Sequence, residues 1–190
     1  PAGPAVRLTR VPGRDRGIVR ELARKVAEIA ALPVQEEKRR LWRRLNALDP
    51  VRPMVWIYEI PWQELEREDE LACRCEDGFA RLVDRDLRET LYNWNHMRTD
   101  MVVDGVYRTP LHYHDTGFGI EWHRARSTTQ YGMDAAAFVP ILRDHGDLEM
   151  IRTPVVTPDP AATERDYANA RELLGDALPV EKRGVCHMWF

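Results

Sequence analysis

The sequence predicts an α/β fold in which helices cover a parallel sheet. Two short and almost wholly apolar runs, at 53–58 and 101–103, are too short for helices and are typical of buried strands. Between them, apolar residues recur at helical spacing over 79–94, and Asp77 is a candidate N-cap for that helix. Because both strands are apolar along their whole length, both of their faces should be covered. This order of strand, helix and strand therefore favours a parallel sheet.

Two further helices are expected before the first strand. Apolar residues at helical spacing over 18–30 predict the first helix, which ends before Pro33. The second is expected at about 34–48, where charged side chains surround an apolar stripe. Asp49-Pro50 should stop it, because the residue before a proline is disfavoured in helical conformation.

After the second strand the pattern becomes extended and more polar. Residues 111–123 alternate and contain two glycines, which predicts a hairpin or another excursion from the main sheet. A proline-rich loop is expected at 153–162. Thr163 is expected to cap a helix that runs to about Leu174 and ends at Gly175.

Composition and charge limit the class of protein. The chain has 190 residues, of which 44% are hydrophobic, and a net charge of −3. Residues 1–48 carry twelve Lys and Arg against five Asp and Glu, a sum of +7, so the remaining residues sum to −10. Because the overall balance is acidic, we expect no nucleic-acid partner. No apolar run approaches the ~18 residues of a membrane span and no secretory signal is visible, which predicts a cytoplasmic protein without a membrane partner.

The cysteines and the common catalytic motifs exclude several chemistries. Three cysteines are an odd number, which fits free thiols in a reducing compartment. One residue separates Cys73 from Cys75, a spacing too tight for the usual zinc pair. The sequence holds no phosphate loop, no His-Glu-x-x-His and no Gly-x-Ser-x-Gly, so nucleotide-binding and common hydrolase chemistries have no support.

Several segments resemble the N-terminal half of the uroporphyrinogen decarboxylase-like superfamily, which includes corrinoid-protein methyltransferases of one-carbon metabolism. The resemblance is carried by segments 52–57, 100–103 and 117–122, and most specifically by 147–154 with the helix and residues 175–180 that follow. Residues 21–42 are similar to a divergent branch whose members are roughly twice as long, the ordinary length of a (β/α)8 barrel of the TIM type. The resemblance implies an N-terminal helical extension at 1–48 and the first half of such a barrel at 49–190, with the chain truncated at its C-terminus.

Two departures from the family pattern bear on the reaction. Glu59 stands where the decarboxylases have an arginine that binds substrate carboxylates, and a carboxylate there would repel an anion. The family's catalytic aspartate falls near Tyr107, while Asp104 comes three residues early and is expected on a different face. Both departures argue against porphyrinogen decarboxylation and favour the methyltransferase side of the superfamily.

The candidate catalytic residues are Glu59 and Tyr107. Glu59 follows a predicted barrel strand, where such enzymes place catalytic groups, and Trp56 and Trp62 flank it. In these surroundings its carboxyl could have a raised pKa and act as an acid, a base or an orienting group. The alternative is an ion pair with one of the many arginines.

Aromatic and histidine side chains form two further candidate sites. The residues expected to line a pocket for a flat ligand such as a corrin are Trp56, Tyr58, Trp62 and Trp122. His112 and His114 are two positions apart and could share a zinc ion with His123 or Asp115 as a third ligand. The alternative for the histidines is an exposed or partner-facing strand.

The leading hypothesis is a corrinoid-linked methyltransferase. Its corrinoid (cobalamin) would be a substrate or be carried by a partner protein, and a zinc ion would activate a thiol through ligands that lie beyond these residues. The alternatives are a decarboxylase acting on a tetrapyrrole-type acid, and a non-catalytic binding or assembly module that uses the basic helix at 34–48 and the apolar residues 185–190. A second copy of the chain is a further candidate partner.

Overall fold

The computed structural model is a mixed α/β structure and describes residues 12–57, 59–65, 69–97, 99–120, 124–128, 134–138 and 140–184. The chain divides into two compact units. The first comprises the residues up to Leu111 together with those from Ala161 onward, and the second comprises His112–Pro160. Each unit is described by itself.

Helices form most of the first unit. They are α1 (Gly13–Ala30), α2 (Pro33–Asn46), α3 (Trp62–Leu65), α4 (Gly78–His96) and α5 (Pro160–Leu174). The helices predicted at 18–30, 34–48 and 79–94 are confirmed. Asp77 caps α4 as expected, since its side chain accepts hydrogen bonds from the backbone N–H groups of Phe79 and Ala80, both at 2.9 Å.

The start of α5 differs from the prediction. The helix begins at Pro160, so Thr163 lies inside it and is buried rather than serving as the cap. Proline suits the first helical position because the backbone N–H that it lacks has no partner within the helix there. The predicted end at Gly175 is confirmed, and its φ of +62° is a conformation that glycine adopts readily.

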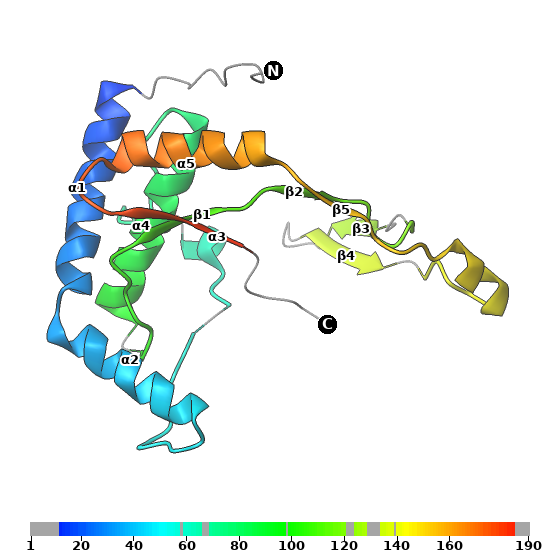
Figure 1. The fold of residues 1–190 in the computed structure, drawn as a ribbon, viewed down its shortest axis with the longest axis horizontal. Coiled ribbons are helices and arrows are strands. Elements are labelled where there is room, and N and C mark those ends of the chain that lie inside the picture. The colour runs from blue at the N-terminus through cyan, green and yellow to red at the C-terminus, as the bar shows by residue number, and fades with distance from the viewer. Residues whose placement is uncertain are drawn as a thin grey trace. The chain divides into compact units, whose positions relative to one another are not determined.

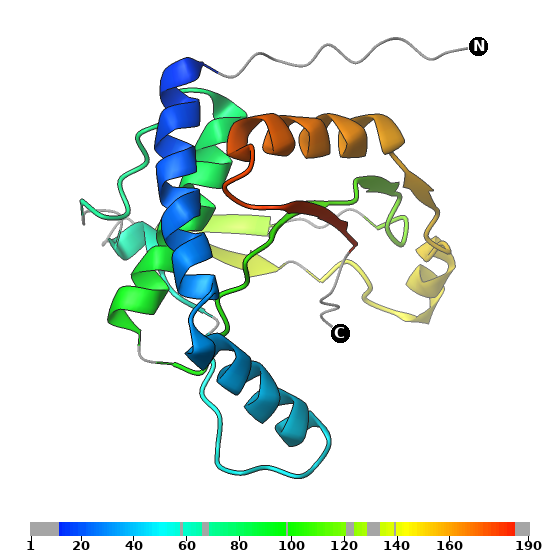
Figure 2. The ribbon, with the colours of Figure 1, turned by 60° about the vertical axis from the view of Figure 1, so that its left-hand side comes forward.

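The core of the first unit lies where α1, α4 and α5 meet. Figures 1 and 2 show α1 and α4 side by side, with α5 running alongside the strands of this unit. The core side chains are buried and include Val19, Leu22 and Val26 of α1, Ala80, Val83 and Leu87 of α4, and Ala170, Leu173 and Leu174 of α5. Arg20 joins two of these helices by donating hydrogen bonds, each 3.1 Å long, to the carbonyls of Leu173 and Glu172.

Two parallel strands complete the first unit. β1 (Tyr107–Pro110) pairs with β6 (Val180–Arg183), with Tyr107 opposite Val180 and Pro110 opposite Arg183. The helix α5 precedes β6, so the chain contains the parallel strand pair with a helical crossover that an α/β fold requires. Within the described residues the strands form two-stranded sheets and no closed barrel.

The positions of the strands correct the sequence prediction. Neither 101–103 nor the described part of 53–58 is a strand, and the strands of this unit are instead more polar segments. The predicted runs are extended but lack ladder partners. Val55 exchanges hydrogen bonds with Asp100, and the backbone N–H of Val103 donates to the side-chain oxygen of Gln35 at 3.0 Å.

The second unit consists of short strands and one 3-10 helix. β2 (Tyr113–Asp115) pairs antiparallel with β5 (Val156–Pro158), β3 (Arg124–Thr128) pairs antiparallel with β4 (Asp134–Phe138), and η1 spans His145–Met150. The extended conformation expected after residue 111 is therefore present, although residues 121–123 lie outside the described part. The region 153–162 is not wholly a loop, because it supplies β5.

None of the helices in the described ranges is long and apolar enough to span a lipid bilayer.

Candidate functional site

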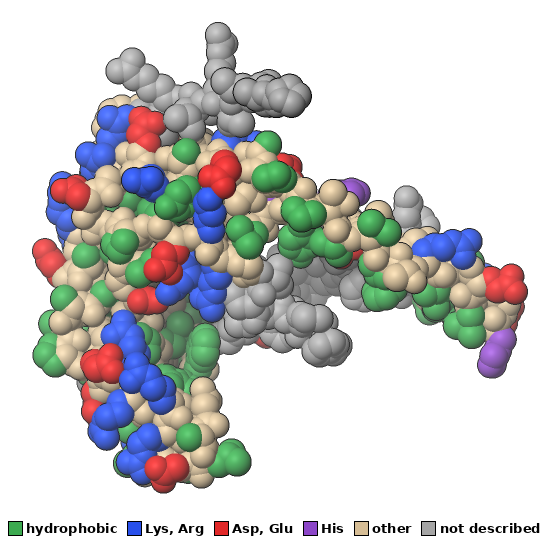
Figure 3. Space-filling model, in the orientation of Figure 1, with side chains coloured by type: hydrophobic (Ala, Val, Ile, Leu, Met, Phe, Trp, Pro, Cys, Tyr) green, Lys and Arg blue, Asp and Glu red, His purple; other side chains and the backbone are tan. Residues whose placement is uncertain are grey.

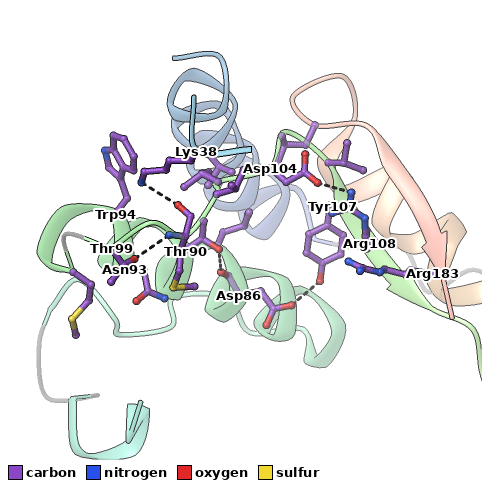
Figure 4. Close-up of a pocket in the computed structure, with 18 residues that line it drawn as sticks. Lys38, Asp86, Thr90, Asn93, Trp94, Thr99, Asp104, Tyr107, Arg108 and Arg183 are labelled. Carbon is purple, nitrogen blue, oxygen red and sulfur yellow. Dashed lines mark hydrogen bonds and ion pairs between the residues drawn. The ribbon is translucent and has the colours of Figure 1, made fainter. Parts of the chain in front are cut away.

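A cavity of about 320 Å³ lies in the first unit, beside α4 and the start of β1. Figure 4 shows polar side chains on two sides of it. The residues that line the cavity come from α2, from α4, from the segment between α4 and β1, and from both strands. The polar and aromatic residues among them are Lys38, Asp86, Thr90, Asn93, Trp94, Thr99, Asp104, Tyr107, Arg108 and Arg183. Residues far apart in the chain therefore converge on one small space.

Tyr107 and Asp86 form a hydrogen-bonded pair in this cavity. Tyr107 is the first residue of β1, and its phenolic O–H donates to Oδ2 of Asp86 on α4 at 2.9 Å (Figure 4). Part of Asp86 still meets solvent, but the protein around it desolvates its carboxyl and raises its pKa, while the hydrogen bond from Tyr107 opposes this shift. Burial, together with the negative charge of Asp86, raises the pKa of Tyr107.

This pair combines a permanent hydrogen-bond donor with a carboxylate base. The raised pKa of Tyr107 makes its phenol a weaker acid, so it keeps its proton and keeps donating a hydrogen bond to the carboxylate. Because the pKa of Asp86 is raised, the carboxyl is a stronger base than an ordinary aspartate when it is ionised. Perturbed ionisable groups that line a cavity are typical of functional sites.

Two arginines lie on the same side of the cavity as Tyr107. Figure 4 shows Arg108 and Arg183 close to the tyrosine. Arg108 forms ion pairs with Asp104 and, at 3.8 Å, with Glu181, so its charge is largely balanced. The side chain of Arg183, the last residue of β6, has no ion pair within the described residues. Arg183 is therefore the cation best placed to hold an anion beside Tyr107 and Asp86.

The opposite wall carries a lysine and an amide. Nζ of Lys38 donates to the carbonyl of Met101 at 3.1 Å and lies 5.1 Å from the centre of the Trp94 ring. Burial lowers the pKa of Lys38, and the charge of Asp100 opposes this shift. Asn93 has a buried side-chain oxygen that receives no hydrogen bond within the described residues. This oxygen is an acceptor that a bound ligand or water can use.

Glu59 lies apart from this cavity. Its side chain is exposed, it does not line the cavity, and it forms no ion pair within the described residues. Two surroundings were considered for Glu59: a pocket between tryptophans and an ion pair with an arginine. Within the described residues the Glu59 carboxylate has neither. Its catalytic role stays a prediction without a geometric argument.

The aromatic residues expected to form a corrin pocket lie in different surroundings. Trp56 packs edge-on against Trp42, with ring centres 5.9 Å apart. Trp62 packs against Tyr92 of α4, with ring centres 6.1 Å apart. Tyr58 and Trp122 lie outside the described residues. Within the described part of the chain, no enclosed pocket joins Trp56 and Trp62.

The histidines and cysteines give little support to a metal site. His114 lies in β2 and His112 just before it, and the described residues contain no group of three His, Cys, Asp or Glu able to hold a metal. His123 lies outside the described part, so the zinc site stays a prediction. Cys73 and Cys75 are free thiols, and burial raises the pKa of both, to about 12 for Cys75. Thiols with raised pKa values stay protonated, as expected for ordinary structural cysteines.

Three residues of the cavity were missed or misplaced by the sequence analysis. Asp86 and Arg183 were not singled out, because one aspartate on a polar helix face and one arginine among many carry no distinguishing pattern. Asp104 was expected on a different face from Tyr107 but lines the same cavity. The segment between them is not a regular strand, so the alternation of faces does not apply.

Comparisons with known proteins provide no further assignment. The chain has no significant match to a protein-family model, to a curated protein or to a solved structure.

Proposed function

We propose that the chain is part of a uroporphyrinogen decarboxylase-like barrel enzyme and that the cavity around Tyr107 and Asp86 is its substrate site. The observation that carries the proposal is the position of Tyr107. The resemblance puts this residue near the family's catalytic aspartate, and it lines a cavity in contact with a carboxyl of raised pKa. Two features of different origin thus point to one residue.

The proposal includes the (β/α)8 architecture. Its support is the parallel pairing of β1 with β6 and the helix α5 before β6, which is the connection that such barrels repeat. In this arrangement β1 and β6 would be neighbouring barrel strands, and the second unit would be an excursion inserted between β1 and α5.

Each of the three main residues of this site would have its own role in the proposed reaction. Arg183 would bind the anionic group of a small substrate. Asp86 would take a proton from the reacting group and later release it to solvent, and Tyr107 would orient the carboxylate through its hydrogen bond. The free oxygen of Asn93 would accept a hydrogen bond from the substrate.

The size of the cavity favours methyl transfer over decarboxylation of a tetrapyrrole acid. At about 320 Å³ it lies at the small end of the ~300–1,000 Å³ that ligand pockets span. A tetrapyrrole macrocycle with its carboxylates is too large for it, whereas a small methyl donor or acceptor is not. The corrinoid, which would carry the methyl group, is also too large for this cavity, so we assign it to a partner protein or to the rest of the barrel.

We also propose that the protein acts in the cytoplasm. The free thiols of Cys73 and Cys75 support this location, because unpaired cysteines are typical of reducing compartments.

The test measures the bound corrinoid and the methyltransferase activity of the natural protein isolated from its source. We expect bound or exchangeable corrinoid, and demethylation of methylcobalamin by a small anionic thiol such as 3-mercaptopropionate. The variant Tyr107→Phe should slow this reaction. Release of CO2 from a porphyrinogen would favour the decarboxylase instead. Absence of both reactions, with no corrinoid bound, would leave the non-catalytic module as the better account.

A further inference from the structure

A second hollow, of about 490 Å³, lies on α2 and is distinct from the cavity that contains Tyr107 and Asp86. Arg39, Trp42, Arg43 and Asn46 of α2 line it, together with Trp56 and the pair Met101 and Val102. The last two also line the cavity of Tyr107, so they form a wall between the two spaces. The hollow is mostly apolar and aromatic.

The aromatic walls of the hollow are fixed by hydrogen bonds. The indole N–H of Trp42 donates to the carbonyl of Asp100 at 2.8 Å, which fixes the direction of its ring. Trp56 follows Val55, whose backbone N–H donates to the carboxylate of Asp100 at 2.8 Å and whose carbonyl accepts from the N–H of Asp100 at 2.9 Å. Arg52 holds the same carboxylate through two hydrogen bonds of 2.9 and 2.6 Å. These bonds anchor the backbone next to Trp56, and its ring packs edge-on against the Trp42 ring, with ring centres 5.9 Å apart.

Trp56 is exposed in spite of this fixed position. Its exposed fraction is 56%, although an indole gains more than most side chains from burial. The edge-on contact with Trp42 covers part of the ring. A large aromatic face that is left open is a stacking platform for another planar group.

The rim of the hollow is positively charged. Arg39 and Arg43 share the single carboxylate of Glu36, at 3.5 and 3.1 Å. Arg39 also lies 3.6 Å from Asp104, but Arg108 pairs with that same aspartate. Arg43 keeps 69% of its side chain exposed. Figure 3 shows basic side chains gathered along α2 next to apolar ones.

We infer that this hollow binds a planar aromatic ring that carries an anionic group, with the ring on Trp56 and the phosphate or carboxylate on Arg43 and Arg39. Stacking on an indole tolerates many ring types, and guanidinium groups pair with either anion. The inference does not depend on the catalytic role of Tyr107. It concerns a different space and a different ligand class.

The experiment follows the indole N–H signal of Trp56 in ¹H–¹⁵N NMR spectra of the full chain during titration. The probes are adenosine 5′-monophosphate and indole-3-acetate, which distinguish phosphate from carboxylate, and their neutral counterparts adenosine and indole-3-acetamide. At least one anionic probe should shift the signal at lower concentration than its neutral counterpart.

Matched variants separate a site from a general attraction. Trp56→Ala should weaken binding about tenfold, followed by the Trp42 indole signal, within the range of base–aromatic stacking. Arg43→Ala should weaken it about threefold to fivefold, as expected of an exposed ion pair. Arg40→Ala is the control, since Arg40 is also an exposed arginine of α2 paired with a glutamate but does not line the hollow. Both Trp56 and Arg43 are exposed, so the core signals of α1 and α4 should not move.

Three outcomes would overturn the inference. One is that no probe shifts the Trp56 signal. Another is that neutral and anionic probes bind equally, or that Arg40→Ala weakens binding as much as Arg43→Ala. The third is that the Trp56 signal depends on protein concentration while sedimentation reveals a dimer, which would make the hollow an interface between two copies.

Discussion

Two aspartates of α4, only two positions apart, differ in surroundings and in hydrogen-bond partners. Asp84 is fully buried and its carboxylate is saturated, because it accepts from the backbone N–H of Arg74 at 2.6 Å and of Cys75 at 3.0 Å and from Nε of Arg88 at 2.6 Å. Asp86 has one side-chain partner, Tyr107, and faces a cavity. Burial and the number of partners thus differ together: the Asp84 carboxylate is enclosed and saturated, whereas the Asp86 carboxylate is open to solvent and can accept further hydrogen bonds.

The largest effect is expected on the structural side of this comparison. Asp84→Ala should destabilise the fold by about 3–5 kcal/mol, because it leaves the buried guanidinium of Arg88 and two backbone N–H groups without an acceptor. Urea unfolding followed by circular dichroism measures this loss. The matched control is Asp86→Ala, which should lose no more than about 1 kcal/mol. Equal losses of stability in the two variants would contradict the distinction between a structural Asp84 and an Asp86 that the fold does not need.

The next largest effect is expected at Tyr107, the hydrogen-bond partner of Asp86 in the cavity. Tyr107→Phe should lower the turnover of the proposed reaction by about tenfold, because the Asp86 carboxylate loses the hydrogen bond that orients it. Its stability should change by at most about 1 kcal/mol, since one partly exposed hydrogen bond is lost. Steady-state kinetics and urea unfolding of the same variant separate the two effects. A variant that loses stability but keeps its activity would make Tyr107 a packing residue.

Arg183 tests the anion-binding part of the site. Arg183→Ala should weaken binding of a small carboxylate such as propionate about tenfold, because a charge-assisted hydrogen bond is lost. Its urea midpoint should stay unchanged, since Arg183 has no ion pair in the described part of the chain. Calorimetry measures the affinity. Arg108→Ala is a useful contrast, because it also breaks the ion pair with Asp104 and should affect stability.

The smallest effect concerns Asp100, which fixes the wall between the two cavities. Its hydrogen bonds with Arg52 lower the pKa of Asp100 from its ordinary value of 3.8 to about 2. A lowered pKa in the folded state means that the stabilisation is fully present above the pKa of the unfolded chain and is lost as the pH falls from about 4 through about 2. Asp100→Asn should lower the urea midpoint at pH 7, by less than Asp84→Ala because solvent screens this pair. The difference from the parent chain should shrink steadily over this range and disappear only below about pH 2.

The helices were predictable from the sequence, and the strands were not. Residues 18–30, 34–48 and 79–94 show helical periodicity, and the cap at Asp77 follows from local hydrogen bonding. The strands β1 and β6 contain mostly polar or charged residues, so a search for apolar runs missed them and selected 53–58 and 101–103 instead. The run at 53–58 is not buried either, since Val55 and Trp56 are more than half exposed. Strand pairing depends on which backbone lies alongside, and apolarity does not record this.

The candidate site was predictable only in part. Tyr107 was singled out through the resemblance, and the structure adds the cavity around it. Asp86 and Arg183 join it only because α4, β1 and β6 pack together, and no local pattern records this convergence. Glu59 was selected because it follows a presumed strand, and that reason fails where the strand does not form.

The most direct test of the central claim is the titration of the Asp86 carboxyl, followed by ¹³C NMR with and without saturating propionate. The account predicts a pKa above the ordinary 3.8, because the surrounding protein desolvates this group. Propionate bound at Arg183 should raise the pKa further through its negative charge, and this second shift should disappear in Arg183→Ala. An ordinary pKa that propionate does not move would contradict the assignment of this cavity as a substrate site.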